Sequence, residues 1–236
     1  MRTSSLLARR ATAVGGAALT AVLLASCASV APGSAGGDAQ PPSGGGAGAG
    51  GWPGPATSAT SQARTELAAL QVAPQHAMSG YSRDRFPLWA PQGGNCDTRE
   101  AVLKRDGKNV ATDGQCKATS GSWTSPYDGQ AVTDASKLDI DHVVPLAAAW
   151  RAGADTWSDE QRKALANDLT RPQLQAVSAS SNRGKGDQGP DQWKPPLKEA
   201  WCSYAKAWTD VKAFYKLTVT DAEKSALGQM IDTCGA

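Results

Sequence analysis

Histidine, phenylalanine and net charge are all scarce in this chain of 236 residues. Only two histidines are present, His76 and His142, so any mechanism that needs an imidazole has two candidates. The formal net charge is +2, and three of the 24 basic residues lie in the first 27 positions, which leaves 21 basic and 22 acidic residues in the remainder. Bulk charge therefore gives no support for a nucleic-acid partner, which must be argued from local residues. With 8 Trp and a hydrophobic fraction of 40%, a packed core can form and wholesale disorder is excluded.

Long apolar runs are also absent after residue 26. The uncharged run Ala11–Ser26 is too short for the roughly 30 Å hydrocarbon core of a bilayer, and with the basic stretch before it the run is typical of a secretory signal. Its end, Leu-Ala-Ser-Cys, resembles the lipobox of bacterial lipoproteins, which predicts lipidation of Cys27. Ordinary cleavage nearby, with Cys27 discarded, is the alternative. We therefore expect residues 1–27 to be a lipoprotein-type signal peptide, and the protein to be extracellular, held by lipid on the outer face of the cell membrane.

Charge is nearly missing from residues 28–62, where Asp38 is the one charged side chain. This stretch holds 10 of the 25 Gly and 5 of the 14 Pro. Such a composition predicts a disordered tether, which places the single folded domain at residues 63–236.

Four cysteines remain after Cys27, an even number in a chain that passes through an oxidising space. No C-x-x-C motif or nearby histidine accompanies them, so two disulfides are favoured over a zinc site. Three pairings are possible, and the spacing favours Cys96–Cys116 and Cys202–Cys234.

Local patterns predict an α+β domain. Helix starts are indicated by three capping patterns, Asp97 with Glu100, Ser158 with Gln161, and Thr220 with Glu223. Alternating apolar residues predict strands at 137–146 and 173–178. Residues 180–187 carry turn residues, although a short helix beginning at Ser180 fits equally well.

One long helix is indicated near the C-terminus, entered at Pro195-Pro196. Its apolar residues recur at intervals of three and four: Leu197, Trp201, Tyr204, Trp208, Val211 and Tyr215. This spacing is that of a buried helix face, so we assign these aromatic residues to the core and not to a base-stacking surface.

His142 is the better candidate for a catalytic imidazole, because Asp141 directly precedes it and Pro145 ends the predicted strand. His76 has no neighbouring acid and is interpreted as a surface residue. Strict alternation puts Asp139 and Asp141 on one face of the strand and His142 on the other, so they converge only at a strand end or bulge. Asp139 is accordingly a second metal ligand, a residue that contacts the ligands without touching the metal, or a solvated surface acid.

Two segments around these residues resemble a known family: D-I-D-H-V-V-P-L at 139–146 and A-N-D-L-T-R-P-Q-L-Q-A-V-S-A-S-S-N-R-G-K-G-D at 166–187. The resemblance is to the HNH nuclease domain related to the C-terminal part of GmrSD-type restriction endonucleases. It extends over roughly Gly80 to Trp208 and includes G-Y-S-R-D-R-F-P-L-W, C-D-T-R-E and S-P-Y-D-G.

The resemblance implies a ββα-metal core with additional helices, in which one divalent ion is held against the scissile phosphate. By motif, Asp141 would be a metal ligand, His142 the general base, and Asn182 the residue on the helix that ligates the ion or orients the site. In the motif for which the family is named, a second histidine lies on that helix, and this chain has no histidine after His142. Carboxylate and amide oxygens suit Mg²⁺ or Mn²⁺ better than Zn²⁺.

Arg183 and Lys185 follow Asn182, with Gly184 between them and Gly186 after them, and we expect them to contact substrate phosphates. The predicted function is therefore metal-dependent hydrolysis of nucleic acid, DNA favoured, with low sequence specificity, by a monomer that meets the membrane only through Cys27. A non-catalytic lipoprotein that uses the fold as a binding or envelope module is the alternative. A phosphodiesterase for smaller substrates or teichoic-type polymers would use the same chemistry.

Overall fold

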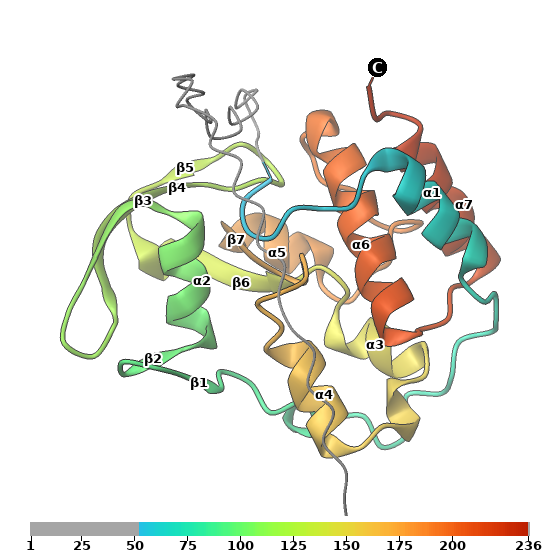
Figure 1. Cartoon of the computed structure of the whole chain (residues 1–236), viewed down its shortest axis with the longest axis horizontal. Coiled ribbons are helices and arrows are strands. Elements are labelled where there is room, and N and C mark those ends of the chain that lie inside the picture. The colour runs from blue at the N-terminus through green and yellow to red at the C-terminus, as the bar shows by residue number, and fades with distance from the viewer. Residues whose placement is uncertain (1–51, 236) are drawn as a thin grey trace, which may run out of the picture. The chain divides into compact units, whose positions relative to one another are not determined.

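The computed structural model describes residues 52–235, so the expected signal peptide and Cys27 lie outside the described part. The described chain is a mixture of helices and sheets, as the sequence predicts (Figure 1). Three helices pack together on one side: α1 (Thr60–Ala69), α6 (Trp201–Tyr215) and α7 (Asp221–Ile231). On the other side lie α2 (Thr98–Asp106) and the sheet β3 (Lys108–Thr112), β4 (Ala118–Thr124) and β5 (Ala131–Val132). Within residues 52–235 no helix is both long and apolar enough to cross a bilayer.

Between these two groups lies a unit of two strands and one helix, which we call the ββα unit (Figure 1). It consists of β6 (Leu138–His142), β7 (Leu174–Ser178) and α5 (Ala179–Lys185). The two strands pair antiparallel in regular register, and α5 follows β7 directly because the Ser178 hydroxyl caps its N-terminus by accepting from Ser181 N. The ambiguous segment after Ser180 is therefore a helix.

Short elements connect these parts. α3 (Leu146–Arg151) follows β6 after Pro145, and α4 (Asp159–Ala166) precedes β7. The remaining elements are β1 (Pro91–Gly93), β2 (Cys96–Asp97) and four 3-10 turns, η1 (Arg83–Arg85), η2 (Ala135–Lys137), η3 (Ala154–Thr156) and η4 (Lys198–Ala200).

The predicted helix caps are present. Ser158 with Gln161 and Thr220 with Glu223 form complete capping boxes at α4 and α7, and Asp97 accepts from Glu100 N at α2. The long helix differs from the prediction at its start, because residues 198–200 form a 3-10 turn and α6 begins only at Trp201.

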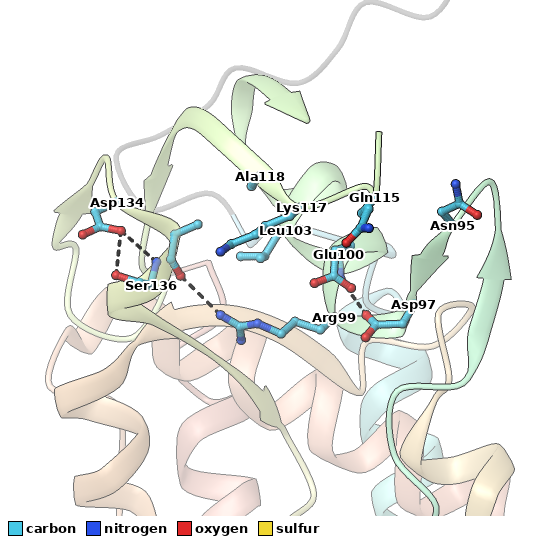
Figure 2. A pocket seen from close by; sticks show the side chains of 11 residues that line it. Asn95, Asp97, Arg99, Glu100, Leu103, Gln115, Lys117, Ala118, Asp134 and Ser136 are labelled. Atoms are coloured by element: carbon cyan, nitrogen blue, oxygen red, sulfur yellow. Dashed lines mark hydrogen bonds between the residues drawn. The ribbon is translucent and has the colours of Figure 1, made fainter. Parts of the chain in front are cut away.

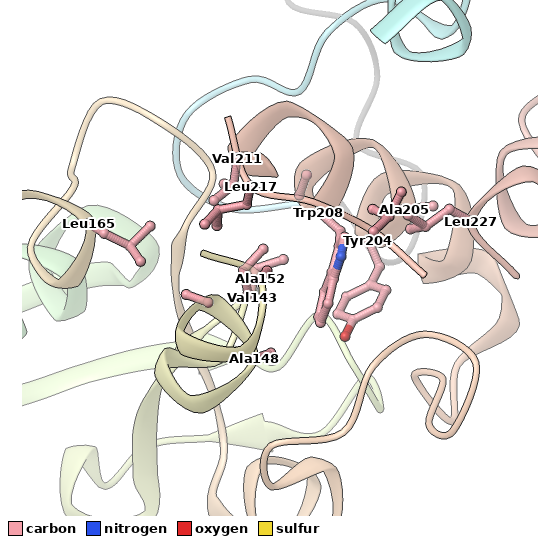
Figure 3. Close-up of a cluster of buried hydrophobic side chains, with 14 of the residues drawn as sticks. Val143, Ala148, Ala152, Leu165, Tyr204, Ala205, Trp208, Val211, Leu217 and Leu227 are labelled. Atoms are coloured by element: carbon pink, nitrogen blue, oxygen red, sulfur yellow. The ribbon is translucent and has the colours of Figure 1, made fainter. Parts of the chain in front are cut away.

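The larger hydrophobic core lies between α6, α7, α1 and the α3 region (Figure 3). Tyr204, Trp208 and Val211, from the predicted apolar stripe, are each fully buried in it. The stripe is therefore core, as expected from its spacing.

A smaller core fixes the register of the ββα unit. Leu138 and Ile140 of β6, together with Leu174 and Ala176 of β7, pack against α2. Burying a Leu or Ile side chain stabilises a fold by about 1.5–3 kcal/mol, and a slip of one residue would turn all four side chains away from α2. The alternate residues of β6, Asp139 and Asp141, must then face α5.

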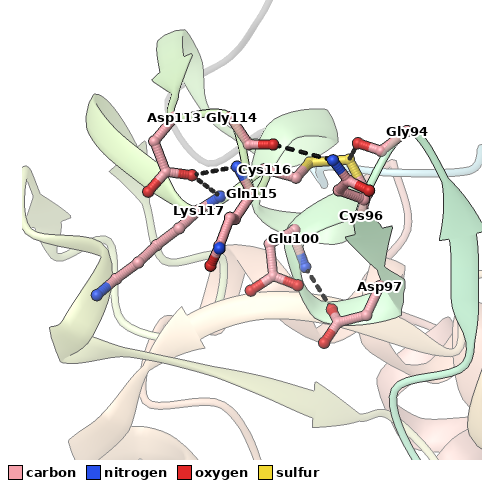
Figure 4. The surroundings of a disulfide bond; sticks show 10 residues. Gly94, Cys96, Asp97, Glu100, Asp113, Gly114, Gln115, Cys116 and Lys117 are labelled. Atoms are coloured by element: carbon pink, nitrogen blue, oxygen red, sulfur yellow. Dashed lines mark hydrogen bonds between the residues drawn. A yellow bond between two sulfur atoms is a disulfide. The ribbon is translucent and has the colours of Figure 1, made fainter.

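Both expected disulfides are present. Cys96–Cys116 joins β2 to the turn between β3 and β4, and Cys202–Cys234 joins α6 to the segment after α7 (Figure 4 shows the first). The four cysteines therefore staple two regions on opposite sides of the ββα unit.

Residues before 63 take part in the fold, although the sequence assigned them to the linker. α1 begins at Thr60, and the Trp52 ring lies 6.0 Å from that of Tyr127 and 6.4 Å from that of Tyr204.

Candidate active site

The ββα unit brings together residues that are more than forty positions apart in the chain. The Asn182 side-chain amide donates to Asp139 Oδ2 at 3.1 Å, and Lys185 Nζ donates to Asp141 Oδ1 at 2.9 Å. Asn182 and Lys185 are three residues apart and therefore lie on one face of α5, which is the face turned to β6. Asp139 and Asp141 share the opposing face of the strand, so each meets one partner.

His142 lies at the end of β6, where its ring leaves the small core. Together with Asp141, Asn182 and Arg183 it lines a pocket of about 270 Å³, which we call the site pocket. Asp141 and His142 sit on opposite faces in the strand register, and they line the same pocket because it lies at the end of β6. The predicted base and the predicted residue on the helix are thus neighbours around one cavity.

The orientation of the His142 ring defines its protonation. Nε2 lies 3.0 Å from the carbonyl oxygen of Ala166 at the end of α4, and a carbonyl can only accept, so Nε2 carries the proton. Nδ1 is then the unprotonated nitrogen, and it has no hydrogen-bond partner among residues 52–235. Burial lowers the pKa of His142 from its usual value to about 3, so the imidazole is neutral at physiological pH.

Asp141 is engaged inside the protein. Besides Lys185 on Oδ1, it accepts from the Tyr127 hydroxyl on Oδ2 at 2.6 Å. Burial raises the pKa of Asp141, and the Lys185 ammonium opposes that shift. Each carboxylate oxygen of Asp141 already accepts one hydrogen bond, so a metal ion would have to share these oxygens with Lys185 and Tyr127.

Lys185 does not reach solvent, in contrast to the expectation that it contacts phosphate. Its side chain is fully buried, and its ammonium donates both to Asp141 and to the backbone carbonyl of His142, at 2.8 Å. Burial lowers the pKa of Lys185, and the Asp141 carboxylate opposes that shift. Lys185 therefore ties α5 to the two residues at the end of β6, and its burial keeps the ammonium out of reach of a substrate in solution.

Asp139 and Asn182 are the oxygen donors that remain open. The Asp139 side chain is 31% exposed, and its only partners in the described residues are Asn182 and, at 3.9 Å, Arg183 Nε. Arg183 is 78% exposed, and its expected contact with a substrate phosphate stays a prediction. Since the Asn182 amide nitrogen faces Asp139, its oxygen points elsewhere.

A divalent ion fits this pair in part. No group of three or more His, Cys, Asp or Glu side chains in residues 52–235 is arranged to hold a metal ion. Mg²⁺ commonly keeps several waters and binds through one or two protein oxygens. The Asp139 carboxylate can supply one, and the Asn182 amide oxygen a second once the amide turns from its present hydrogen bond to Asp139. The donor set suits a hard, hydrated ion and not zinc.

Three residues of the site were not assigned a role from the sequence. Tyr127 lies in the S-P-Y-D-G segment, and Tyr81 and Arg83, which line the site pocket, lie in G-Y-S-R-D-R-F-P-L-W. Both segments belong to the family resemblance, and this was the available signal.

A larger pocket of about 590 Å³ lies away from His142, between α2, β4 and the start of η2 (Figure 2). Arg99 in its wall is engaged with the carbonyl oxygens of Ala135 and Leu138, at 3.3 and 3.0 Å. Burial and then Asp97 raise the pKa of Glu100. The pocket holds neither an imidazole nor an asparagine of α5, so we place the chemistry at the smaller site pocket.

The chain is of a nuclease-related class. The chain belongs to the family of GmrSD restriction endonucleases, C-terminal domain, whose model matches residues 97–230. An uncharacterized secreted protein of Arthroderma benhamiae is 57% identical over 174 residues, which cover 74% of this chain and 85% of that protein. No solved structure matches the chain significantly. The matched family range contains the whole ββα unit, whereas Tyr81 and Arg83 lie before it.

Proposed function

We propose that this protein is a metal-dependent HNH endonuclease that hydrolyses phosphodiester bonds with His142 as the general base. The observation that carries the proposal is the ring of His142, which lines the site pocket with its Nε2 proton held by Ala166 O, while Nδ1 has no hydrogen-bond partner among residues 52–235. A neutral imidazole fixed in one tautomer is prepared to accept a proton from water.

In the proposed step, a water oxygen attacks phosphorus while its proton passes to His142 Nδ1. The bond from phosphorus to the 3′-oxygen breaks, the leaving 3′-oxygen takes up a proton from solvent to become a hydroxyl, and the product keeps the phosphate on its 5′ side. His142 becomes an imidazolium with both nitrogens protonated, and the nearby negative charge of the substrate phosphate favours that form. The proton then returns to solvent.

Asp139 and Asn182 would hold one Mg²⁺ or Mn²⁺ ion, which supplies charge neutralisation at the phosphate and help for the leaving oxygen. Arg183, exposed beside Asp139, would contact a phosphate of the nucleic acid. Asp141 positions the strand end through Lys185 and Tyr127. This assignment moves the role of ligand from Asp141 to Asp139.

The proposed substrate is nucleic acid, DNA before RNA, because the family is that of a restriction endonuclease domain. We propose an extracellular location, since residues 1–27 have the pattern of a secretory signal and the Arthroderma benhamiae relative is a secreted protein. Lipid attachment at Cys27 and a tether over residues 28–62 belong to the same proposal. Mass spectrometry of the mature N-terminus tests the lipid.

Plasmid nicking by the purified protein tests the function. We expect nicking with Mg²⁺ or Mn²⁺ and none with EDTA. His142→Ala should lower the rate by roughly 10²–10⁴-fold, as for loss of a general base. His76→Ala is the matched control. His76 is the only other histidine of the sequence, and its side chain is 40% exposed and pairs with Asp155. This variant should nick like the wild type.

Equal rates for both histidine variants and the wild type would show that the cut comes from another site or a contaminant. If no metal supports nicking, a bis(p-nitrophenyl) phosphate assay separates a phosphodiesterase for small substrates from a non-catalytic binding module.

A further inference from the structure

The site pocket has one cationic side chain that the ββα unit does not supply. Arg83 lines it from η1, more than fifty residues before His142 in the chain. We infer that Arg83 is a phosphate-binding residue, which holds the scissile phosphodiester beside His142. The inference rests on the proposed function and adds to it a contact with substrate from outside the family's matched range.

The loop that carries Arg83 is fixed by aromatic packing. The Phe86 ring is buried and lies 6.4 Å from the ring of Trp150, while Tyr81 meets the same indole at 5.8 Å and Phe86 at 6.3 Å. Arg83 stands between these two aromatic anchors in sequence. Its backbone is therefore held on both sides.

The same loop is tied to the structure that orients His142. Asn167 donates to the carbonyl of Pro87 at 2.7 Å and accepts from Ala90 N at 2.8 Å. Ala166, the preceding residue, provides the carbonyl that holds His142 Nε2. The end of α4 thus contacts both the base and the loop that carries Arg83.

The guanidinium of Arg83 has no hydrogen bond or ion pair with any residue in 52–235, unlike its neighbours. Arg151 is bound to the Asp187 carboxylate at 2.7 Å and to its carbonyl, and buried Arg162 to the carbonyl oxygens of Arg85, Ala154 and Trp157. Arg85 faces Asp159 at 3.9 Å and the ring of Trp150 at 6.0 Å. Arg83 therefore keeps its full set of five N–H donors for a ligand.

A phosphodiester matches the guanidinium of Arg83 in charge and shape. A guanidinium presents paired N–H groups that fit two phosphate oxygens, and it stays charged at every physiological pH. The site pocket holds about nine times the volume of a liquid water molecule, room for a phosphodiester group but not for a base pair. Arg83 is close enough to His142 for its charge to contribute to the lowered pKa of that imidazole. An anion between them would be attracted by the arginine and within reach of the base.

The inference is tested with Arg83→Ala, Arg83→Lys and the matched control Arg85→Ala. Each variant is assayed for nicking. In a His142→Ala background with EDTA, each is also assayed for binding of a fluorescein-labelled oligothymidylate over a range of salt concentrations. Circular dichroism verifies that each variant is folded.

For Arg83→Ala we expect kcat/KM to fall roughly 100-fold, as for loss of one donor to the transition state, and binding to weaken about tenfold. The slope of log affinity against log salt should shrink by about 0.7, the value for one phosphate contact on a single strand. Arg83→Lys should recover part of the affinity, because it keeps the charge without the paired donors. Arg85→Ala should behave like the wild type in both assays.

The outcomes separate this inference from the proposed function. If the wild type nicks and Arg83→Ala matches Arg85→Ala in both assays, the nuclease stands and the role of Arg83 is refuted. If the wild type does not nick, but Arg83→Ala lowers the affinity for oligothymidylate and its salt slope, the phosphate site stands and the nuclease is refuted. If neither nicking nor a difference in binding between the two variants is found, both are overturned.

Discussion

Two ion pairs in residues 52–235 have a lysine and a carboxylate that are both buried, and they differ in what they hold. The site pair, Lys185–Asp141, joins α5 to β6, and the core pair, Lys212–Glu223, joins α6 to α7. Each lysine also donates to a backbone carbonyl at 2.8 Å, that of His142 in the site pair and that of Thr218 in the core pair. The chemistry of the two pairs is nearly the same.

Their carboxylates are also satisfied alike. Asp141 accepts from the Tyr127 hydroxyl and Glu223 from the Trp208 indole, each at 2.6 Å. The two pairs differ in the part of the structure that each lysine holds. The core pair holds helix to helix, whereas the site pair holds the carbonyl of the residue whose ring lines the site pocket. A buried pair of the same construction can therefore serve stability alone in one place and positioning in another.

Removing one lysine from each pair is expected to give the largest effects. Lys185→Met and Lys212→Met should each lower the free energy of unfolding by about 3–5 kcal/mol, because a buried carboxylate is left unpaired. Of the two, only Lys185→Met should also reduce the nicking rate of the folded protein, by roughly 100-fold, since a shift of about 1 Å at a catalytic group has that effect. Urea denaturation and nicking at low temperature measure the two quantities.

Replacing both members of a pair sharpens the contrast. Lys212→Met with Glu223→Leu, and Lys185→Met with Asp141→Leu, should each regain part of the lost stability, because no buried charge is left unpaired, although the Trp208 indole and the Tyr127 hydroxyl lose their acceptors. Nicking should stay at the wild-type rate in the first double variant and stay low in the second. Recovery of full activity in the second would show that the site pair has no positioning role.

The pH dependence of stability tests the burial of His142, the residue that the site pair holds. Because the folded protein holds the pKa of His142 at about 3, its unfolded chain takes up a proton below about pH 6.5 that the folded chain does not. The contribution of His142 to stability is therefore complete above pH 6.5 and is lost as pH falls toward 3, at about 1.4 kcal/mol per pH unit. Urea titrations between pH 5 and 6.5 should show a shallower slope for His142→Asn than for the wild type. An unchanged slope would mean that the imbalance in protons lies elsewhere.

Much of the scaffold was predictable because its signals are local. The caps at Ser158 and Thr220 are satisfied by residues three positions away, and the stripe through Trp208 depends only on helical spacing. The sheet β3–β4–β5 was not predicted, since most residues of β3 are exposed and give no apolar alternation. The start of α6 was placed too early because a 3-10 turn cannot be distinguished from a helix by spacing alone.

The candidate site was predictable in its residue types and less so in their directions. His142 and Asn182 line one pocket, as the motif predicts, but the burial of Lys185 depends on α5 being a helix. In a turn, Lys185 would point to solvent like Arg183. In a helix, it shares the inward face of Asn182. Tyr127 reaches Asp141 through tertiary packing, for which the sequence contains no local signal.

Two buried tyrosines, Tyr127 and Tyr204, provide the finest test of the comparison. Tyr127 and Tyr204 are both fully buried with ring centroids 5.6 Å apart, yet the hydroxyl of Tyr127 donates to Asp141, whereas that of Tyr204 has no partner in the described residues. Tyr127→Phe should lower the free energy of unfolding by about 1.5–3 kcal/mol, the range for a hydrogen bond to a charged group. Tyr204→Phe removes an unsatisfied hydroxyl and should leave stability unchanged or slightly raised. Equal losses in urea denaturation would show that ring packing, and not the bond to Asp141, is what the phenol of Tyr127 contributes.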